Sequence, residues 1–96
     1  MAPWEIWTAD VHGDHPVVIV SNPQRVAHKA DVVVLQCVTL RASRMAEAHE
    51  VILDKADGLD WPTLCKCELP YTLPKTRLKQ RRGEVSRERR REIARK

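Results

Sequence analysis

The stretch His15-Pro16-Val17-Val18-Ile19-Val20-Ser21-Asn22 decides the fold, because it predicts a buried strand near the centre of the protein. Four successive β-branched residues follow a proline, and such residues fit the pleated, packed environment of a sheet. Proline itself is tolerated at the first position of a strand. Since apolar residues here do not alternate with polar ones, we expect both faces of this strand to be covered.

The segments around this run predict a mainly β protein with one late helix. Residues 4–10 alternate between two faces and predict a first strand, which residues 11–14 join to the opening stretch as an antiparallel hairpin. Further strands are predicted over residues 31–40, 49–53 and 63–68, and a short helical turn over residues 21–25. Short strands with turn signals between them are typical of a small, strongly curved β-barrel.

The last third of the chain contains two prolines and a predicted basic helix. Pro70 and Pro74 disfavour a place in the middle of a sheet, so we expect an edge or an irregular crossing over residues 69–74. Ser86 is a suitable N-cap for a helix over residues 86–96, which contains few apolar side chains. We therefore expect this basic C-terminal helix to dock lightly, or to belong to a longer native chain.

Charge is divided unevenly along the 96 residues, a length that suits one domain over residues 1–96. Residues 75–96 contain eleven Lys and Arg against three Glu, or 11 − 3 = +8, whereas residues 1–74 contain six basic and ten acidic groups, or 6 − 10 = −4. Such a basic segment indicates an anionic partner, either nucleic acid or an acidic protein segment. A solvated helix whose arginines only keep the protein soluble explains the same run equally well.

Several classes of protein are disfavoured by the composition. No apolar stretch approaches the roughly 20 residues of a membrane span, and the N-terminus lacks a basic region before an apolar core, so we expect a cytoplasmic protein without a secretory signal. Cys37, Cys65 and Cys67 form an odd set, which predicts reduced thiols. Because Cys65 and Cys67 lack a second pair of ligands, we expect core cysteines and neither a metal nor another cofactor.

The ordered motifs of the chain resemble the MazF/PemK/Kid toxins of type II toxin–antitoxin systems. The resemblance begins with Glu5-Ile6-Trp7-Thr8-Ala9-Asp10 and continues through the opening stretch. Four shorter matches follow in order: Val38-Thr39, Gly58-Leu59, Cys67-Glu68-Leu69-Pro70-Tyr71-Thr72 and Lys75-Thr76-Arg77-Leu78. Gly83 stands where these toxins have a glycine before their last helix. The matches span nearly the whole chain, and their order is more specific than any one of them.

The resemblance implies an SH3-like barrel of the CcdB/MazF toxin type and a homodimer. It also implies metal-independent cleavage of single-stranded RNA, with an antitoxin that contributes a short acidic segment as the inhibiting partner. In that reaction a ribose 2′-hydroxyl attacks the adjacent phosphorus and leaves a 2′,3′-cyclic phosphate and a free 5′-hydroxyl. The protein must then move protons and stabilise charge on the phosphoryl oxygens.

Two residues are the candidate catalytic groups. His15 takes the place of the arginine before proline in the family pattern, and a histidine titrates near neutrality whereas an arginine is permanently charged. Thr39 ends a predicted strand, where its hydroxyl is able to bond a phosphate. A plain hairpin residue and an ordinary strand residue are the alternatives at these positions. Candidate RNA-binding residues are His12, Arg41, Arg44, Tyr71, Lys75 and Arg77, with Tyr71 able to stack a base.

A second hypothesis keeps the fold without the catalysis. Leu69, Tyr71 and Pro74 stand where the family pattern has glutamine, arginine and aspartate, and the hairpin loop is shorter than in relatives. The protein would then bind RNA, or grip a protein target as the related CcdB toxins do with gyrase, or bind only an acidic antitoxin-like segment. In all these cases the three tryptophans are expected in the core or at a dimer interface: Trp4, Trp7 and Trp61.

Overall fold

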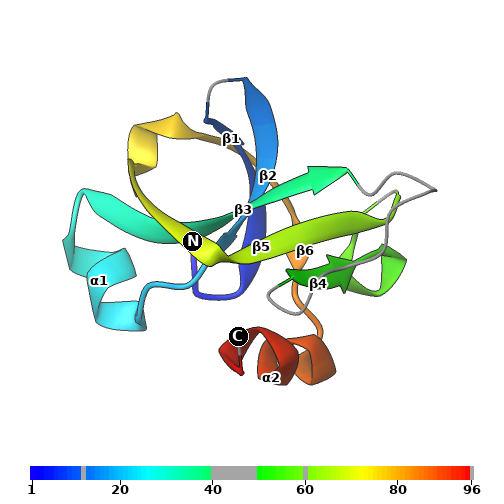
Figure 1. Ribbon diagram of the computed structural model, residues 1–96. Coiled ribbons are helices and arrows are strands. Elements are labelled where there is room, and N and C mark those ends of the chain that lie inside the picture. The colour runs from blue at the N-terminus through cyan, green and yellow to red at the C-terminus, as the bar shows by residue number, and fades with distance from the viewer. Residues whose placement is uncertain (12, 40–49, 60, 96) are drawn as a thin grey trace.

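The computed structural model describes residues 1–11, 13–39, 50–59 and 61–95, and for Thr39, Glu68 and Leu69 it describes the backbone alone. In this part of the chain, one six-stranded sheet curls into a half barrel with the strand order β4-β5-β3-β2-β1-β6 (Figure 1). Neighbouring strands all run antiparallel. The strands are β1 (Glu5–Asp10), β2 (Asp14–Ile19), β3 (Asp31–Thr39), β4 (Glu50–Leu53), β5 (Thr63–Pro74) and β6 (Leu78–Glu84).

Four short helices among the described residues accompany the sheet, and the whole confirms the prediction of a mainly β protein with a C-terminal helix. They are α1 (Pro23–His28), the 3-10 turns η1 (Lys55–Asp57) and η2 (Lys75–Arg77), and the C-terminal α2 (Arg87–Ala94). Asn22 caps α1, because its side chain accepts a hydrogen bond from the Arg25 backbone N–H at 2.8 Å. None of the helices in the described part of the chain has the length and apolar character that a membrane span requires.

The stretch that decides the fold forms β2, which lies between β1 and β3 in the sheet. Val17, Val18 and Ile19 have no exposed surface. Val17 and Ile19 pack in one hydrophobic cluster, which includes Val26 of α1, whereas Val18 packs in a second cluster on the other face. Both faces of β2 are therefore covered, as the unbroken β-branched run predicts.

The predicted hairpin joins β1 to β2. Asp10 is paired with Asp14 at its closed end, and Ile6 is paired with Val18 farther along the two strands. Gly13 has a φ of +108°, a conformation that side chains rarely adopt, so the glycine permits the tight turn. This short connection places Asp14 and His15 at the end of the sheet that the hairpin closes.

The second half of β5 lies at an edge of the sheet, one of the two alternatives expected for residues 69–74, although the strand itself is longer than predicted. A strand was expected to end at residue 68, but β5 continues to Pro74 and pairs with β3 from Leu35↔Pro70 to Asp31↔Pro74. The pairs with β4 involve only residues 63–66 of β5. The prolines therefore lie where β5 has a neighbour on one side only, and there a missing N–H costs no ladder hydrogen bond.

Strand β6 was not predicted from the sequence. Its residues read Leu-Lys-Gln-Arg-Arg-Gly-Glu, with no apolar alternation to indicate a strand. It nevertheless pairs with β1, with Thr8 opposite Gln80 and Glu5 opposite Glu84. The segment is a strand because it forms backbone hydrogen bonds with β1. This tertiary contact outweighs its weak intrinsic β-propensity.

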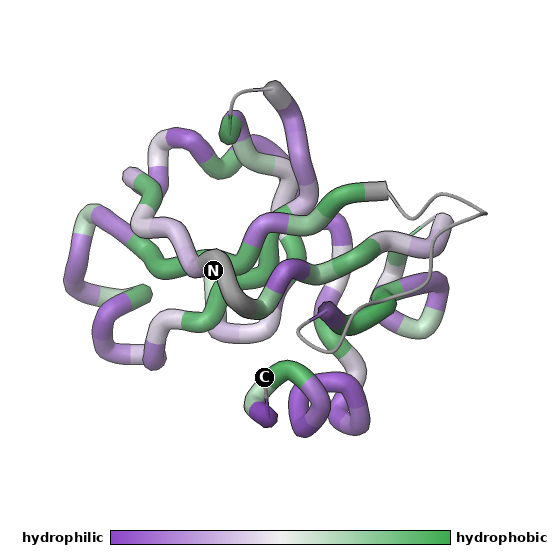
Figure 2. The backbone as a smooth tube through the Cα atoms, viewed as in Figure 1, coloured by the Kyte–Doolittle hydropathy of each residue, from purple (hydrophilic) through white to green (hydrophobic). Residues whose placement is uncertain are grey.

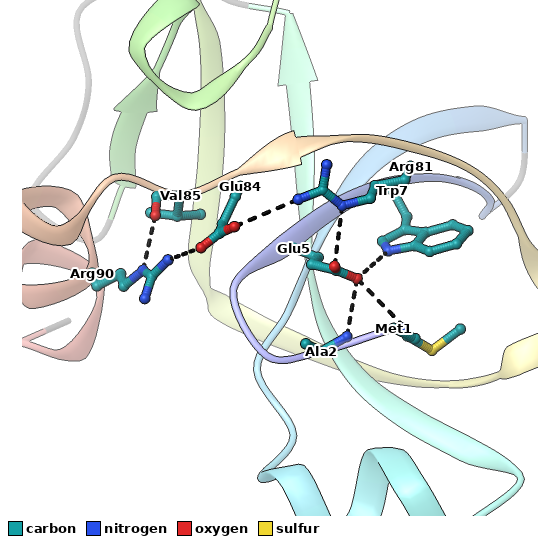
Figure 3. A network of polar contacts seen from close by, with 8 residues as sticks. All are labelled: Met1, Ala2, Glu5, Trp7, Arg81, Glu84, Val85 and Arg90. Carbon is teal, nitrogen blue, oxygen red and sulfur yellow. Dashed lines mark hydrogen bonds and ion pairs between the residues drawn. The ribbon is translucent and has the colours of Figure 1, made fainter.

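A network of polar contacts ties β1, β6 and α2 together (Figure 3). Glu5 accepts hydrogen bonds from Trp7 Nε1 at 3.0 Å and from Arg81 Nε at 3.1 Å. Partial burial raises the pKa of Glu5, but the hydrogen bonds from Trp7 and Arg81 outweigh it, and the pKa lies below its usual value. Arg81 and Arg90 both reach Glu84, so α2 is connected to β1 through side chains of β6.

Helix α2 docks through both apolar and polar contacts. Ile93 is its buried residue, and Figure 2 shows the helix as hydrophilic along most of its length with a hydrophobic segment near its end. Arg90 lies over the ring of Trp4, 5.9 Å from its centroid, and its Nε donates to the Val85 carbonyl at 2.8 Å. The expectation of a lightly docked helix was based on the few apolar side chains and did not include these polar contacts.

Candidate functional site

A groove of about 510 Å³ lies at the end of the sheet that the β1–β2 hairpin closes. Strands β1, β2, β3 and β6 border it, together with the residues just before β5. Its described lining residues, which define what we call the hairpin groove, are Thr8, Asp14, His15, Pro16, Val38, Trp61, Gln80 and Arg82. Of the sequence-predicted site residues, His15 is the one that this described lining contains.

One row of side chains crosses three strands in the hairpin groove. Thr8 is paired with Pro16 of β2 on one side and with Gln80 of β6 on the other, and residues paired in this way share a face of the sheet. Arg82 is half-buried and its Nη1 donates to Thr8 Oγ1 at 3.3 Å. This contact holds its guanidinium, a permanent cation, in the groove.

His15 lies at the start of β2, half-buried and paired with Ala9 of β1. Strand alternation places its side chain on the face of Val17, opposite to that of Pro16 and Thr8. The hairpin groove therefore borders both faces of β2 near its first residues. Chemically it combines an imidazole, which can accept or donate hydrogen bonds, with a permanent cation.

Two other charges at this end of the sheet form an ion pair. Lys79 Nζ lies 2.7 Å from Asp14 Oδ1, and this hydrogen bond and the negative charge of Asp14 raise the pKa of Lys79. Lys79 is thus paired with an acid at the edge of the groove. Among the described residues of the lining, Arg82 carries the permanent positive charge.

The three tryptophans differ in burial. Trp61 is 50% exposed and lies outside the core, so that of its two expected places only the dimer interface stays a prediction, whereas Trp4 and Trp7 are half-buried and pack against the two hydrophobic clusters. Besides the hairpin groove, Trp61 lines a second hollow of about 260 Å³ together with Asp54, Lys55 and Pro62. An exposed indole thus borders two concave surfaces.

The other candidate residues fall into two groups. Thr39 ends β3 opposite Thr63, but its side chain is not described, and three further candidates lie outside the described residues: His12, Arg41 and Arg44. Tyr71 on β5 and Arg77 in η2 are exposed, and Lys75 Nζ donates to the Val26 carbonyl of α1. None of these last three belongs to the described lining of the hairpin groove, so the structure does not bring them together with His15 there.

The arginines of α2 also divide into two groups. Arg89 and Arg90 form ion pairs with Asp54, Asp57 and Glu84. The outward-facing arginines repeat every four residues along the helix and are exposed: Arg87, Arg91 and Arg95. Part of the basic C-terminal segment therefore stabilises the fold, and the exposed part lies at the end of the molecule away from the β1–β2 hairpin (Figure 1).

Sequence reasoning missed Arg82, Gln80 and Trp61. Arg82 lies at a register shift in the pairing of β6 with β1, so simple strand alternation in the sequence does not indicate its place. Trp61 follows a turn-like segment, and a tryptophan there is equally compatible with a core position. Pairing between distant strands, not local sequence, brings these residues to His15.

The cysteines lie in the core of the sheet. Cys37 and Cys65 have no exposed surface and are free thiols. They lie opposite each other on the neighbouring strands β3 and β5, and Cys67 is half-buried. Within the described ranges, no group of three or more His, Cys, Asp or Glu side chains is arranged to hold a metal ion.

Comparisons with known proteins agree with this fold. The family model described as PemK-like, MazF-like toxin of type II toxin–antitoxin system matches residues 2–96. The structure is similar to the Mycobacterium tuberculosis toxin MazF-mt6, with a TM-score of 0.84, 24% identity, and coverage of 95% of this chain and 89% of that chain. It is also similar to an endoribonuclease in complex with its cognate antitoxin from a mycobacterial species, with a TM-score of 0.83, 27% identity, and coverage of 98% and 87%. A search of curated proteins returned no match.

Proposed function

This chain belongs to the PemK-like, MazF-like toxin family of type II toxin–antitoxin systems, and on that basis we propose that it is an endoribonuclease that cleaves single-stranded RNA. One similar solved protein, 27% identical, is described as an endoribonuclease. The observation that carries the proposal for this chain is that His15 and Arg82 line one groove. Together they offer the two functions that the reaction requires, a proton carrier and a fixed positive charge.

The reaction proceeds in the hairpin groove without a metal. Neutral His15 accepts the proton of a ribose 2′-hydroxyl, whose oxygen attacks the adjacent phosphorus while the bond from phosphorus to the 5′ oxygen breaks. The departing 5′ oxygen takes a proton from solvent, and the products are a 2′,3′-cyclic phosphate and a 5′-hydroxyl. Arg82 stabilises the charge on the phosphoryl oxygens, which replaces the fixed charge that the family pattern has at position 15. Thr39 contributes a hydroxyl to the same phosphate.

The proposed partners follow from the family. A cognate antitoxin with an acidic segment inhibits the enzyme, as the antitoxin complex of the mycobacterial relative suggests. The toxin acts as a homodimer on cytoplasmic mRNA, and neither membrane nor cofactor takes part.

The test is cleavage of a panel of single-stranded RNAs in EDTA. We expect His15→Ala to lower the rate at least about 100-fold, the usual contribution of a positioned proton carrier. Arg82→Gln lowers the rate as well, whereas Arg91→Gln, an exposed arginine of α2, serves as the matched control and leaves it unchanged. The proposal fails if no RNA is cut by the wild-type protein and His15→Ala leaves its effect on cell growth intact.

One observation favours a second candidate function. His15 stands where the family pattern has arginine, and Tyr71 is exposed and separate from the hairpin groove. A protein that has lost catalysis would still inhibit growth by binding RNA or a protein target. In that case growth inhibition persists in His15→Ala, no cyclic phosphate forms, and the bound partner is recovered intact.

A further inference from the structure

We propose that Trp61 is the platform of a nucleobase subsite next to the hairpin groove, an inference that rests on the proposed action on single-stranded RNA. The base stacks on the indole over the hollow formed with Asp54, Lys55 and Pro62. The phosphate of the same nucleotide strand lies on the other side of Trp61, near Arg82.

Exposure of Trp61 is the first argument. An indole that is 50% exposed leaves a large apolar surface in water, which costs free energy unless a ligand covers it. Because Trp61 borders both the hairpin groove and the second hollow, a strand that passes through the groove meets the ring. Stacking on aromatic rings is the common way in which proteins hold unpaired bases.

The platform is also held in place. Thr63 is almost completely buried at the start of β5, and its Oγ1 donates to the Trp61 carbonyl at 3.1 Å. Pro62, between them, restricts the backbone further. Little conformational freedom of the backbone is therefore lost when a base binds, which favours affinity.

The wall of the second hollow offers a base a hydrogen-bond acceptor, Asp54, beside the cation of Lys55. Asp54 accepts hydrogen bonds from Ala56 N–H at 3.0 Å and from Arg89 Nη2 at 3.1 Å, so its carboxylate has a fixed position. The Asp54 side chain retains 39% exposure, which leaves acceptor capacity toward the hollow. A carboxylate accepts a hydrogen bond from the exocyclic amine of a base. Arg82, on the other side of Trp61, has the charge that suits phosphate.

The test uses two probes that the enzyme cannot cleave by 2′-hydroxyl attack. One is a mixed-sequence pool of 2′-O-methyl heptanucleotides, and the other is inorganic polyphosphate of similar charge, which has no bases. We expect Trp61→Ala to weaken binding of the heptanucleotides roughly 5- to 150-fold, the range for one base–aromatic stack, and to leave polyphosphate binding unchanged. Trp61→Phe retains most of the affinity, whereas Trp61→Leu loses it, because leucine is apolar but has no π face. Ile52→Ala, which shortens another exposed apolar side chain, is the control without effect.

Several results would overturn the subsite. The first two are an unchanged heptanucleotide affinity in Trp61→Ala and an equal loss of polyphosphate affinity in that variant. The others are equal heptanucleotide affinities of the Trp61→Leu and Trp61→Phe variants, and a change of oligomeric state that accounts for the weaker binding. The outcome is separable from that of the proposed function, since neither probe reports on catalysis. If the protein cleaves RNA and the Trp61 variants bind the heptanucleotides normally, the proposed function stands and the subsite fails. If the Trp61 variants lose binding but the wild-type protein cleaves no RNA, the subsite stands and the proposed function fails.

Discussion

Arg89 Nη1 lies 2.7 Å from the carboxylate of Asp57, whose side chain has no exposed surface. The same carboxylate accepts hydrogen bonds from the backbone N–H groups of Asp54 at 3.0 Å and Ser86 at 2.8 Å. Asp57 therefore joins the end of η1 to the first turn of α2. Burial lowers the pKa of Arg89, but hydrogen bonding to Asp54 and the charge of Asp57 outweigh it, so that its pKa is raised.

Arg89→Met is expected to destabilise the protein strongly. It leaves the buried Asp57 carboxylate without its cation, and breaking a buried pair in this way costs roughly 3 kcal/mol. Arg91→Met on the same helix removes an exposed arginine and is expected to change the stability by less than about 0.5 kcal/mol. Urea unfolding of both variants measures the difference, and equal midpoints would contradict a structural role of Arg89.

The Asp54 carboxylate makes stability depend on pH. Hydrogen bonding from Arg89 and from the Ala56 N–H lowers the pKa of Asp54 below its usual value of 3.8, so its ionised form stabilises the fold. This contribution is present above about pH 5 and is lost as pH falls through 3.8 and below. Because Asp54 is partly exposed, we expect its ionised form to contribute roughly a few tenths of a kcal/mol to the free energy of unfolding.

Asp54→Asn tests this contribution, because asparagine keeps an oxygen that can cap η1 but has no charge. Urea unfolding at several pH values between 3 and 7 is the measurement. The wild-type protein is expected to lose more stability than the variant toward the acid end. Parallel curves for the two proteins would rule out Asp54 as a source of the pH dependence.

Gly83→Ala is expected to disturb the joint between β6 and η1. A Cβ at Gly83 would lie 2.2 Å from the Asp57 carbonyl oxygen and 3.1 Å from the Cα of Gly58, and backbone atoms cannot move aside as a flexible side chain can. We expect a loss of about 1–3 kcal/mol, typical of overpacking. Thermal unfolding checks it, and a melting temperature equal to that of the wild type would show that the two backbones are farther apart.

His15→Arg restores the residue of the family pattern and separates charge from proton transfer. If His15 carries the proton, the wild-type pH–rate profile has a limb in the range where histidines titrate, and His15→Arg loses that limb. Initial cleavage rates in EDTA between pH 5 and 9 provide the profile. A limb that persists in the variant would assign proton transfer to another residue.

Salt dependence distinguishes Arg82 from the arginines of α2. A phosphate contact contributes about one unit to the slope of log affinity against log salt, so Arg82→Gln is expected to reduce the slope by about one unit. Arg91→Gln is the control, because α2 lies away from the β1–β2 hairpin (Figure 1). The measurement uses the uncleavable heptanucleotides. A reduced slope in Arg91→Gln as well would extend the RNA interface to the C-terminal helix.

The parts of the fold with strong local signals were predictable. The β-branched run of β2, the turn around Gly13 and the cap at Asn22 each depend on residues that are neighbours in sequence. The family resemblance depends on the same local motifs in order, and the match over residues 2–96 confirms it. Strand β6 was missed because its strand state comes from pairing with β1.

The family, the strand β2 with both faces covered, and His15 as the departure from the family pattern can all be read from local sequence. The surroundings of His15 depend on how the chain folds. Arg82 and Trp61 come from segments far away in the chain, and they meet at the hairpin groove because the sheet curls and β6 pairs with β1. Side-chain alternation and β-branched runs are local properties that a sequence displays directly, whereas strand pairing across many residues is a property of the folded chain.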